Sequence, residues 1–196
     1  HEPMVARLDS MFVAPNTYNY GTYGFVIHEI AEMVALNMGQ YAHGNQPVQH
    51  AIYLYDYIGQ PWKTQYHLRN VMDKLYNSGS KGYCGDEDNG QTSAWYVFSA
   101  MGFYPVCPGT PYYIIGSPSF PRMSIRLENG KTFTILAHNA NKKNIYIQSA
   151  KLNGKEYDKN YFTHQDIIQG GTLEFQMGPN LSLIHISEPT RLQLIS

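Results

Sequence analysis

Three adjacent carboxylates, Asp86, Glu87 and Asp88, stand between two glycines in the stretch GYCGDEDNGQTSAWY. The stretch then becomes apolar, and its pattern predicts a helix from about Ser93 to Met101. Unpaired backbone amides and the macrodipole at a helix N-terminus favour negative charge. Such a loop could be a solvated turn that caps the helix, hold a cation, or keep an aspartate ionised as a general base.

The acidic loop matches a calcium-binding loop of the EF type only at its start. Asp86 and Asp88 fit the first and third positions, but Gly90 occupies the fifth, and no glutamate stands at the twelfth. The sequence therefore argues against a self-contained calcium loop. Capping by Asp88 or Thr92 requires one side chain, and three carboxylates exceed that need. A catalytic loop and a solvated turn both stay open on these residues alone.

A second polar group is the segment HEIAE, from His28 to Glu32. A zinc-protease helix of the HExxH type requires a histidine at the fifth position, where Glu32 stands, so that site is absent. Positions 28 and 32 share one face of a helix, with Glu29 beside them. A salt bridge on a solvated face explains these side chains as well as a polar pocket does.

A third polar group surrounds the expected start of another helix and comprises His43, Asn45, Gln46 and His50. Asn45 is a suitable N-cap because its side chain can accept a bond from a free helix amide. The two histidines could share a metal, but caps and surface histidines are the simpler interpretation.

Four helices and a set of hairpins must position these groups. Helical periodicity covers residues 22–39, 44–59 and 60–79, in addition to the helix near 93–101. From about Pro105 the period becomes that of strands, with three hairpin signals. These signals are Asn129-Gly130, Asn153-Gly154 and Gly170-Gly171. The sequence predicts an α+β fold in which helices precede a small antiparallel β module.

Composition limits the class of partner. The net charge is −1, with 14 basic and 15 acidic residues, so no electrostatic footprint for nucleic acid exists. No apolar run approaches the roughly 18 residues of a membrane span. The 17 tyrosines suit either carbohydrate binding or a tyrosine-rich core. Cys84 and Cys107 form no CxxC pair, and a disulfide and two free thiols are both open.

Three long segments together resemble the C-terminal part of glycoside hydrolase family 92. They are QYAHGNQPVQHAIYLYDYIGQPWKTQ, GYCGDEDNGQTSAWYVFSAMGFYPVCPG and IYIQSAKLNGK, in collinear order within residues 1–180. The family contains calcium-dependent, inverting exo-α-mannosidases. The resemblance implies that residues 1–104 are the last helices of an (α/α)6 catalytic barrel and that 105–180 form the β module. The tail 181–196 differs in character from the rest, and we expect it to be non-native.

The resemblance also implies roles for individual residues. The general base of the family maps onto Asp86 and Asp88, where it activates a water on the sugar face opposite the leaving group. In inverting enzymes the acid and the base stand roughly 6.5–9.5 Å apart. The acid, a glutamate in the family, is expected upstream of His1, in a missing domain of the same chain. We therefore expect the isolated 196-residue chain to be inactive.

The polar groups in the first half of the chain acquire substrate and metal roles by the same resemblance. His28 and Glu29 match a pair that contacts the leaving mannose in α-1,2-selective members. Calcium in this family binds the O2 and O3 hydroxyls of the sugar, and the candidate ligands on this chain are Glu32, Asn45 and Gln46, together with the aspartates of the acidic loop. Many members carry glutamate where Gln46 stands.

The resemblance thus implies part of a secreted or periplasmic bacterial α-mannosidase that hydrolyses mannosides of N-glycans or mannans. The alternative is a non-catalytic carbohydrate-binding protein that uses the β module and the tyrosines. A purely structural scaffold would leave the three carboxylates without a purpose.

Overall fold

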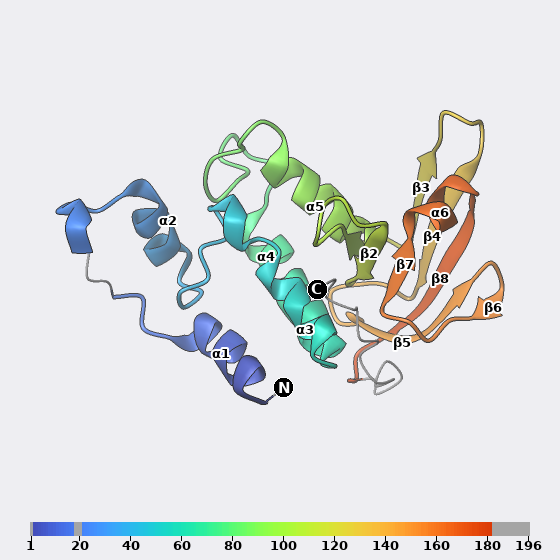
Figure 1. The fold of residues 1–196 in the computed structure, drawn as a ribbon, viewed down its shortest axis with the longest axis horizontal. Helices are drawn as coiled ribbons and strands as arrows, with labels where there is room; N and C mark the ends of the chain where they lie inside the picture. Colours follow the sequence, from blue (N-terminus) through green and yellow to red (C-terminus); the bar gives the residue numbers. More distant parts are fainter. Residues whose placement is uncertain (1, 18–20, 182–196) are drawn as a thin grey trace. The chain divides into compact units, whose positions relative to one another are not determined.

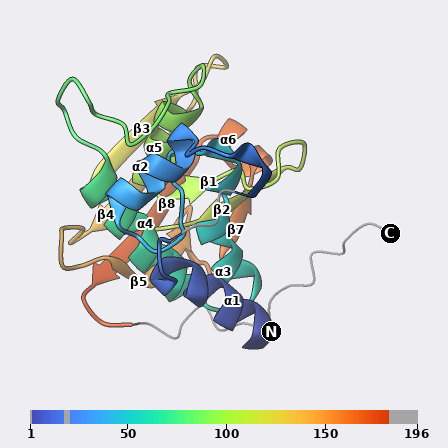
Figure 2. The same ribbon diagram turned by 90° about the vertical axis from the view of Figure 1, so that its left-hand side faces the viewer.

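The computed structural model describes residues 2–17 and 21–181 (Figures 1 and 2). Its helices are α1 (Glu2–Val13), α2 (His28–Leu36), α3 (Leu54–Tyr57), α4 (Pro61–Leu75), α5 (Gln91–Met101) and α6 (His164–Ile168). Single 3-10 turns cover Gly21–Tyr23, Gln46–Val48 and Ala51–Tyr53. Within the described residues, no helix is both long and apolar enough to cross a membrane.

The strands all follow α5 in the chain. They are β1 (Phe103–Tyr104), β2 (Tyr112–Ile115), β3 (Arg122–Arg126), β4 (Thr132–His138), β5 (Tyr146–Leu152), β6 (Lys155–Glu156), β7 (Tyr161–Thr163) and β8 (Gly171–Gly178). Helices followed by strands confirm the predicted α+β fold class. The predicted non-native tail lies outside the described residues from position 182 onward.

The backbone divides into two compact units. Unit 1 contains residues 1–51 and 70–96, and unit 2 contains 52–69 and 97–196. The helical segments within 52–69 and 97–101 therefore cluster with the strands, while the boundary at 104 stays a prediction from the sequence.

Unit 1 is held together by buried aromatic and aliphatic side chains. Its core residues include Leu8, Met33, Tyr41, Val71, Leu75 and Trp95. Helix α2 occupies the middle of the predicted helix 22–39 and ends earlier than Gly39, because Asn37 takes a left-handed C-cap conformation at φ 49°. The Asn37 backbone N–H donates to the Val34 carbonyl and closes the helix.

The predicted helix over 44–59 is wrong in its first part. Two 3-10 turns replace it, and only Leu54–Tyr57 is α-helical. The side chain of Asn45 makes no capping bond. Tertiary bonds explain the difference, because the indole N–H of Trp95 donates to the carbonyl of Gln49 at 3.1 Å and thereby withdraws it from a helical ladder. The helix predicted over 60–79 forms as α4.

Unit 2 contains two sheets. Three antiparallel strands have the order β1-β2-β7, and five strands have the order β3-β4-β8-β5-β6. In the larger sheet β4 and β8 are parallel, and the other pairs are antiparallel. Alternation along β4 buries Phe133, Ile135 and Ala137, which join the core of this unit.

Two of the three predicted hairpins are confirmed. Asn129-Gly130 connects β3 to β4, and Asn153-Gly154 connects β5 to β6. The hairpin predicted at Gly170-Gly171 is wrong, because residues 164–168 form α6 and β8 then runs parallel to β4. A capping box explains this helix: Thr163 Oγ1 accepts from the Asp166 amide, and Asp166 Oδ2 accepts from the Thr163 amide.

Candidate active site

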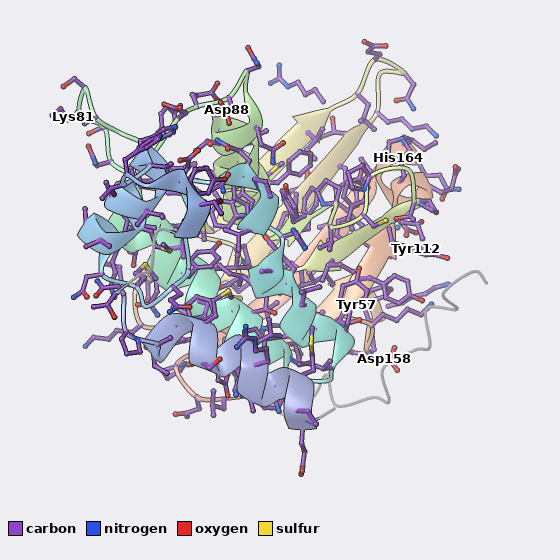
Figure 3. The ribbon with its side chains drawn as sticks, turned by 60° about the vertical axis from the view of Figure 1, so that its left-hand side comes forward. Tyr57, Lys81, Asp88, Tyr112, Asp158 and His164 are labelled. Carbon is purple, nitrogen blue, oxygen red and sulfur yellow. The ribbon has the colours of Figure 1, made fainter. Side chains whose placement is uncertain are left out.

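The acidic loop of unit 1 turns sharply just before α5. Asp88, Asn89 and Gly90 all have positive φ, at 50°, 56° and 101°. Aspartate and asparagine tolerate this left-handed region better than other non-glycine residues. The turn directs the chain back toward the first residues of α5, and Figure 3 labels Asp88 on this loop.

Glu87 is the residue that caps α5. Its Oε2 accepts from the Gly90 amide at 2.5 Å, and its Oε1 accepts from the Ser93 amide at 3.2 Å and the Ser93 hydroxyl at 2.5 Å. The Ser93 hydroxyl bond, followed by the Gly90 amide bond, lowers the pKa of Glu87. Sequence reasoning missed this role, because the residues that bind the Glu87 carboxylate follow it by as many as six positions.

Asp86 and Asp88 keep their carboxylates exposed. In the part of the chain that the structure describes, neither carboxylate makes a hydrogen bond or ion pair. The backbone of Asp86 is nevertheless fixed, because its carbonyl accepts from Thr92 Oγ1 at 2.9 Å. The loop therefore presents two acceptor groups from a restrained backbone.

Gln46 links the 3-10 turn Gln46–Val48 to the acidic loop. Its Nε2 donates to the Asp86 carbonyl at 2.8 Å and to Thr92 Oγ1 at 3.2 Å. Both donor protons of the amide thus have protein acceptors, and its Oε1 makes no hydrogen bond within the described ranges. That oxygen is available to a ligand.

The carboxylate of Glu32 lies against two glycine backbones, Gly44 and Gly85, which also approach each other closely. A Cβ added to Gly44 would lie 3.1 Å from Glu32 Oε2, and one added to Gly85 would lie 2.8 Å from the same oxygen. This oxygen is buried and lacks a hydrogen-bond partner among the residues that the structure describes. Since Gly44 precedes Asn45 and Gly85 precedes Asp86, Glu32 lies beside both segments. A buried, unpaired carboxylate oxygen is costly unless a proton or a cation satisfies it.

His28 lies between two carboxylates at the start of α2. Its Nδ1 is 3.3 Å from Glu32 Oε1, and its Nε2 is 3.3 Å from Glu29 Oε1. The hydrogen bond to Glu32 and then the charge of Glu29 raise the pKa of this exposed imidazole above 6.5. The charge of Asp86 acts in the same direction, which links α2 electrostatically to the acidic loop.

The structure thus gathers the predicted site residues from three separate segments of unit 1. Short distances join His28 to Glu29 and Glu32, and Gln46 to the backbone of Asp86, whereas Asn45 and Asp88 belong to the same segments without a side-chain hydrogen bond or ion pair to the others in the described residues. Asn45 is exposed, and its side chain has no capping bond. Over the described residues, no group of three or more His, Cys, Asp or Glu side chains could hold a metal, so any cation here would also need amide oxygens.

The structure contradicts a metal shared by His43 and His50, and the favoured interpretation as surface histidines holds only for the exposed His50. His43 is buried, and its two ring nitrogens bind Tyr41 Oη at 2.8 Å and Tyr76 Oη at 2.7 Å. Burial lowers the pKa of His43 to about 3, so this imidazole is neutral at physiological pH. Both of its nitrogens are used within the core.

The two thiols are free. Cys84 is half-buried, and Cys107 is exposed. Burial raises the pKa of Cys84 to about 11, so its thiol is protonated at neutral pH and is a poor nucleophile.

Comparison with known proteins identifies the protein family to which the chain belongs. Residues 1–179 match the model of the glycosyl hydrolase family 92 catalytic domain. The chain is 34% identical over 183 residues to an uncharacterized secreted glycosidase of Arthroderma benhamiae. The match covers 83% of this chain and 24% of that protein. The chain belongs to glycosyl hydrolase family 92.

Solved structures give the same family. The GH92 inverting mannosidase BT2199 of Bacteroides thetaiotaomicron matches with 72% identity and a TM-score of 0.80, over 96% of this chain and 26% of its own. The GH92 α-mannosidase BT3965 of the same organism, in complex with mannoimidazole, matches with 37% identity and a TM-score of 0.82, over 93% of this chain and 23% of its own. The chain therefore spans about a quarter of these relatives.

Proposed function

We propose that this chain supplies the general-base side of the active site of an inverting exo-α-mannosidase. One observation carries the proposal: Glu32 packs against both Gly44 and Gly85 while Gln46 binds the Asp86 carbonyl, so three distant segments converge on one acidic site. Relatives named as mannosidases, one of them at 72% identity, support the choice of substrate.

The base in this proposal is Asp86 or Asp88. Both carboxylates are exposed on a loop whose backbone is restrained, and Glu87 uses its own carboxylate to cap α5. An exposed aspartate without a protein partner can accept a proton from a water. In an inverting mechanism that water attacks the anomeric carbon from the face opposite the leaving group, and a separate acid protonates the departing oxygen.

Calcium fits the oxygen groups beside the base. Glu32 offers a buried oxygen without a partner in the described segments, and Gln46 offers an amide oxygen whose nitrogen is already bound to the loop. Asn45 adds an uncommitted exposed amide. Carboxylate and amide oxygens are the ligands that calcium prefers. When bound, the ion would supply a positive centre for sugar hydroxyls and help to distort the ring.

His28 and Glu29 would bind the leaving mannose. The raised pKa of His28 favours its charged form, in which Nε2 donates toward Glu29 and Nδ1 donates toward Glu32. A donor and an acceptor side by side suit a vicinal pair of sugar hydroxyls. We assign α-1,2-linked mannosides of N-glycans or mannans as the substrate.

The acid glutamate would come from residues outside this chain, and the whole protein would be secreted or periplasmic. The name of the secreted fungal relative supports an extracytoplasmic location. Hydrolysis of α-1,2-mannobiose by the isolated 196-residue chain would contradict this division of the site.

The test uses the whole protein that contains these residues. Proton NMR of α-1,2-mannobiose hydrolysis should show β-mannose as the first product, since inversion converts an α-glycoside into the β-anomer. Removal of calcium with a chelator should abolish turnover, and added calcium should restore it. Initial release of α-mannose, or full activity without calcium, would overturn the corresponding part of the proposal.

A further inference from the structure

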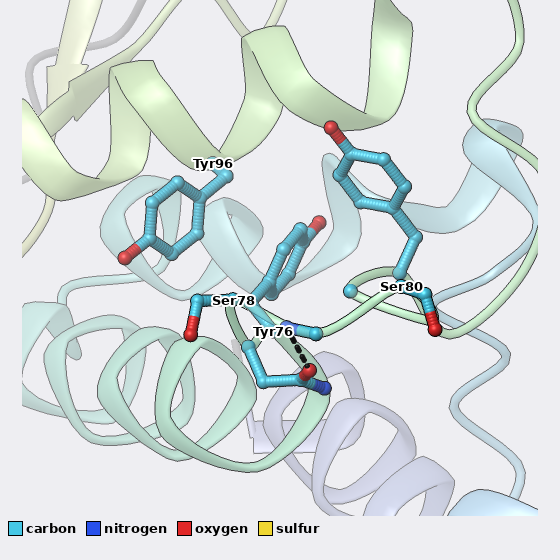
Figure 4. A pocket seen from close by; sticks show the side chains of 8 residues that line it. Tyr76, Ser78, Ser80 and Tyr96 are labelled. Atoms are coloured by element: carbon cyan, nitrogen blue, oxygen red, sulfur yellow. Dashed lines mark hydrogen bonds between the residues drawn. The ribbon is translucent and has the colours of Figure 1, made fainter.

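A pocket of about 510 Å³ lies in unit 1 beside the loop that leads to the acidic residues. Figure 4 shows its lining, in which tyrosine rings stand around the turn formed by residues 77–82. Three tyrosines and two serines supply most of its functional groups: Tyr76, Tyr83, Tyr96, Ser78 and Ser80. The volume falls within the range of roughly 300–1,000 Å³ that is usual for small-molecule sites.

The floor of this tyrosine pocket is rigid. The hydroxyl of Tyr76 binds His43 Nε2 at 2.7 Å, and the Tyr76 ring stacks against Trp95 with centroids 5.9 Å apart. Tyr96 packs on the same ring at 4.8 Å. Because His43 and Trp95 are fully buried, the core of unit 1 fixes Tyr76 in one orientation.

The rim of the pocket is also ordered by local bonds. Asn77 Oδ1 accepts from the Gly79 amide at 2.9 Å, and the Asn77 amide donates to the Gly82 carbonyl at 3.2 Å. Figure 4 shows the first of these bonds at the base of the turn. The turn therefore presents Ser78 and Ser80 from a closed loop and not from an extended strand.

Tyr83 forms the accessible wall. It is 42% exposed, and its ring meets Tyr76 edge to face with centroids 6.2 Å apart. It precedes Asp86 by three residues in the same loop. A ligand on Tyr83 would thus bind to the segment that carries the proposed base.

The lining indicates the chemistry of the ligand. No Asp, Glu, Lys, Arg or His belongs to it, so the pocket has no charged group to recognise an ion. Aromatic faces with hydroxyls at their edges suit a ring that has apolar C–H faces and hydroxyls around its rim. A neutral pyranose has both features.

We propose that the tyrosine pocket is a second sugar-binding subsite, which holds a pyranose residue of the glycan other than the mannose that is cleaved. The inference rests on the proposed function for the identity of the glycan, but its binding step does not require hydrolysis. Tyr83 would stack on the sugar, and Ser78 or Ser80 would bind its hydroxyls.

The test compares a short and a long substrate in the whole protein. Tyr83→Ala should raise KM for a manno-oligosaccharide by about 5- to 10-fold, the loss expected for one aromatic stacking contact. It should leave kcat for that substrate, and both constants for a simple aryl mannoside, unchanged. Tyr83→Phe should behave like the wild type in stacking. Tyr66→Ala, which removes a tyrosine 48% exposed in unit 2, is the matched control and should change nothing.

Calorimetric titration with the oligosaccharide separates this inference from the proposed function. If mannosides bind but are not hydrolysed, the proposed function fails, and the affinity ratio of Tyr83→Ala to wild type still tests the pocket. Equal KM changes for both substrates, or unchanged oligosaccharide affinity in Tyr83→Ala and in Ser78→Ala, would overturn the subsite. The serine variant removes no ring, so it keeps the test valid if the tyrosine variant fails to fold.

Discussion

Gln46 connects two segments of the proposed site through its amide nitrogen, a donor that a carboxylate lacks. Gln46→Glu would place a carboxylate oxygen against the Asp86 carbonyl. The Asp86 carbonyl and Thr92 Oγ1 would then both lose the hydrogen bond that the Gln46 amide donates. We expect kcat/KM for mannobiose to fall about tenfold, the effect of roughly 1.4 kcal/mol. Steady-state kinetics with His50→Gln, an exposed neighbour, as the control would check this. Unchanged or higher activity would mean that Gln46 does not restrain the loop.

His28 should titrate above its ordinary pKa of 6.5, because Glu32 and Glu29 stabilise its charged form. The contribution of these ion pairs to stability is complete below pH 6.5 and is lost as the pH rises through the higher pKa of the folded state. NMR titration of the imidazole should show a lower pKa in Glu32→Gln, while Glu128→Gln, an exposed change in unit 2, should leave it unaltered. The same pKa in both variants would contradict the geometry.

Residue types and spacing alone predicted which side chains are candidates, but not how they meet. The pairing of His28 with Glu32 follows from helical spacing and could be anticipated. The burial of Glu32 Oε2 could not, because it depends on Gly44 and Gly85 approaching from distant segments. The cap by Glu87 also depended on an unusual turn.

At the scale of the element, the acidic loop and α5 form one structure held by Glu87. Glu87→Gln should lower the thermal unfolding midpoint by about 2–4 °C, because it weakens the charge-assisted bonds to Gly90 and Ser93. Since the pKa of Glu87 is lowered in the fold, its contribution is present above pH 4.5 and lost as the pH falls through that lower value. Thermal scans at pH 7 and pH 3.5 test this: the variant and the wild type should differ more at pH 7. An equal difference in unfolding midpoint at pH 7 and at pH 3.5 would contradict the role of Glu87 as the cap of α5.

The two glycine segments must approach closely for Glu32 to reach its place. In Gly85→Ala the new Cβ would lie 2.7 Å from the Gly44 Cα, and we expect a cost of about 1–3 kcal/mol and a loss of activity. Gly109→Ala, in unit 2, has open space around it and should keep full kcat even if its φ of +91° costs some stability. Wild-type kcat and unfolding in Gly85→Ala would show that the segments tolerate separation.

Elements with strong local signals were predictable, and those decided by tertiary bonds were not. The helix Pro61–Leu75 and the turns at Asn129-Gly130 and Asn153-Gly154 follow from periodicity and turn chemistry. The broken helix after Gln46 and the parallel pairing of β8 depend on contacts with residues far along the chain. A local sequence pattern does not indicate which distant residues will bind or pair with a segment.

At the scale of the whole molecule, family membership could be predicted from three collinear motifs, and the comparisons confirm it. Which part of the complete protein supplies each catalytic group could not be predicted as directly, because this chain spans about a quarter of the length of its solved relatives. The proposed mechanism also needs a general acid, and no residue of this chain is assigned to that role. The bonds and close approaches cited for its acidic loop, in contrast, join residues of unit 1.

The most direct measurement is the kcat of Asp86→Asn and of Asp88→Asn in the whole protein, with α-1,2-mannobiose as the substrate. Either exchange keeps the size of the side chain and removes its capacity as a base. The account predicts that at least one variant loses roughly 100-fold or more in kcat. Asp73→Asn, an exposed aspartate on α4, should retain wild-type kcat. Retention of more than a tenth of kcat by both loop variants would contradict the assignment of the general base.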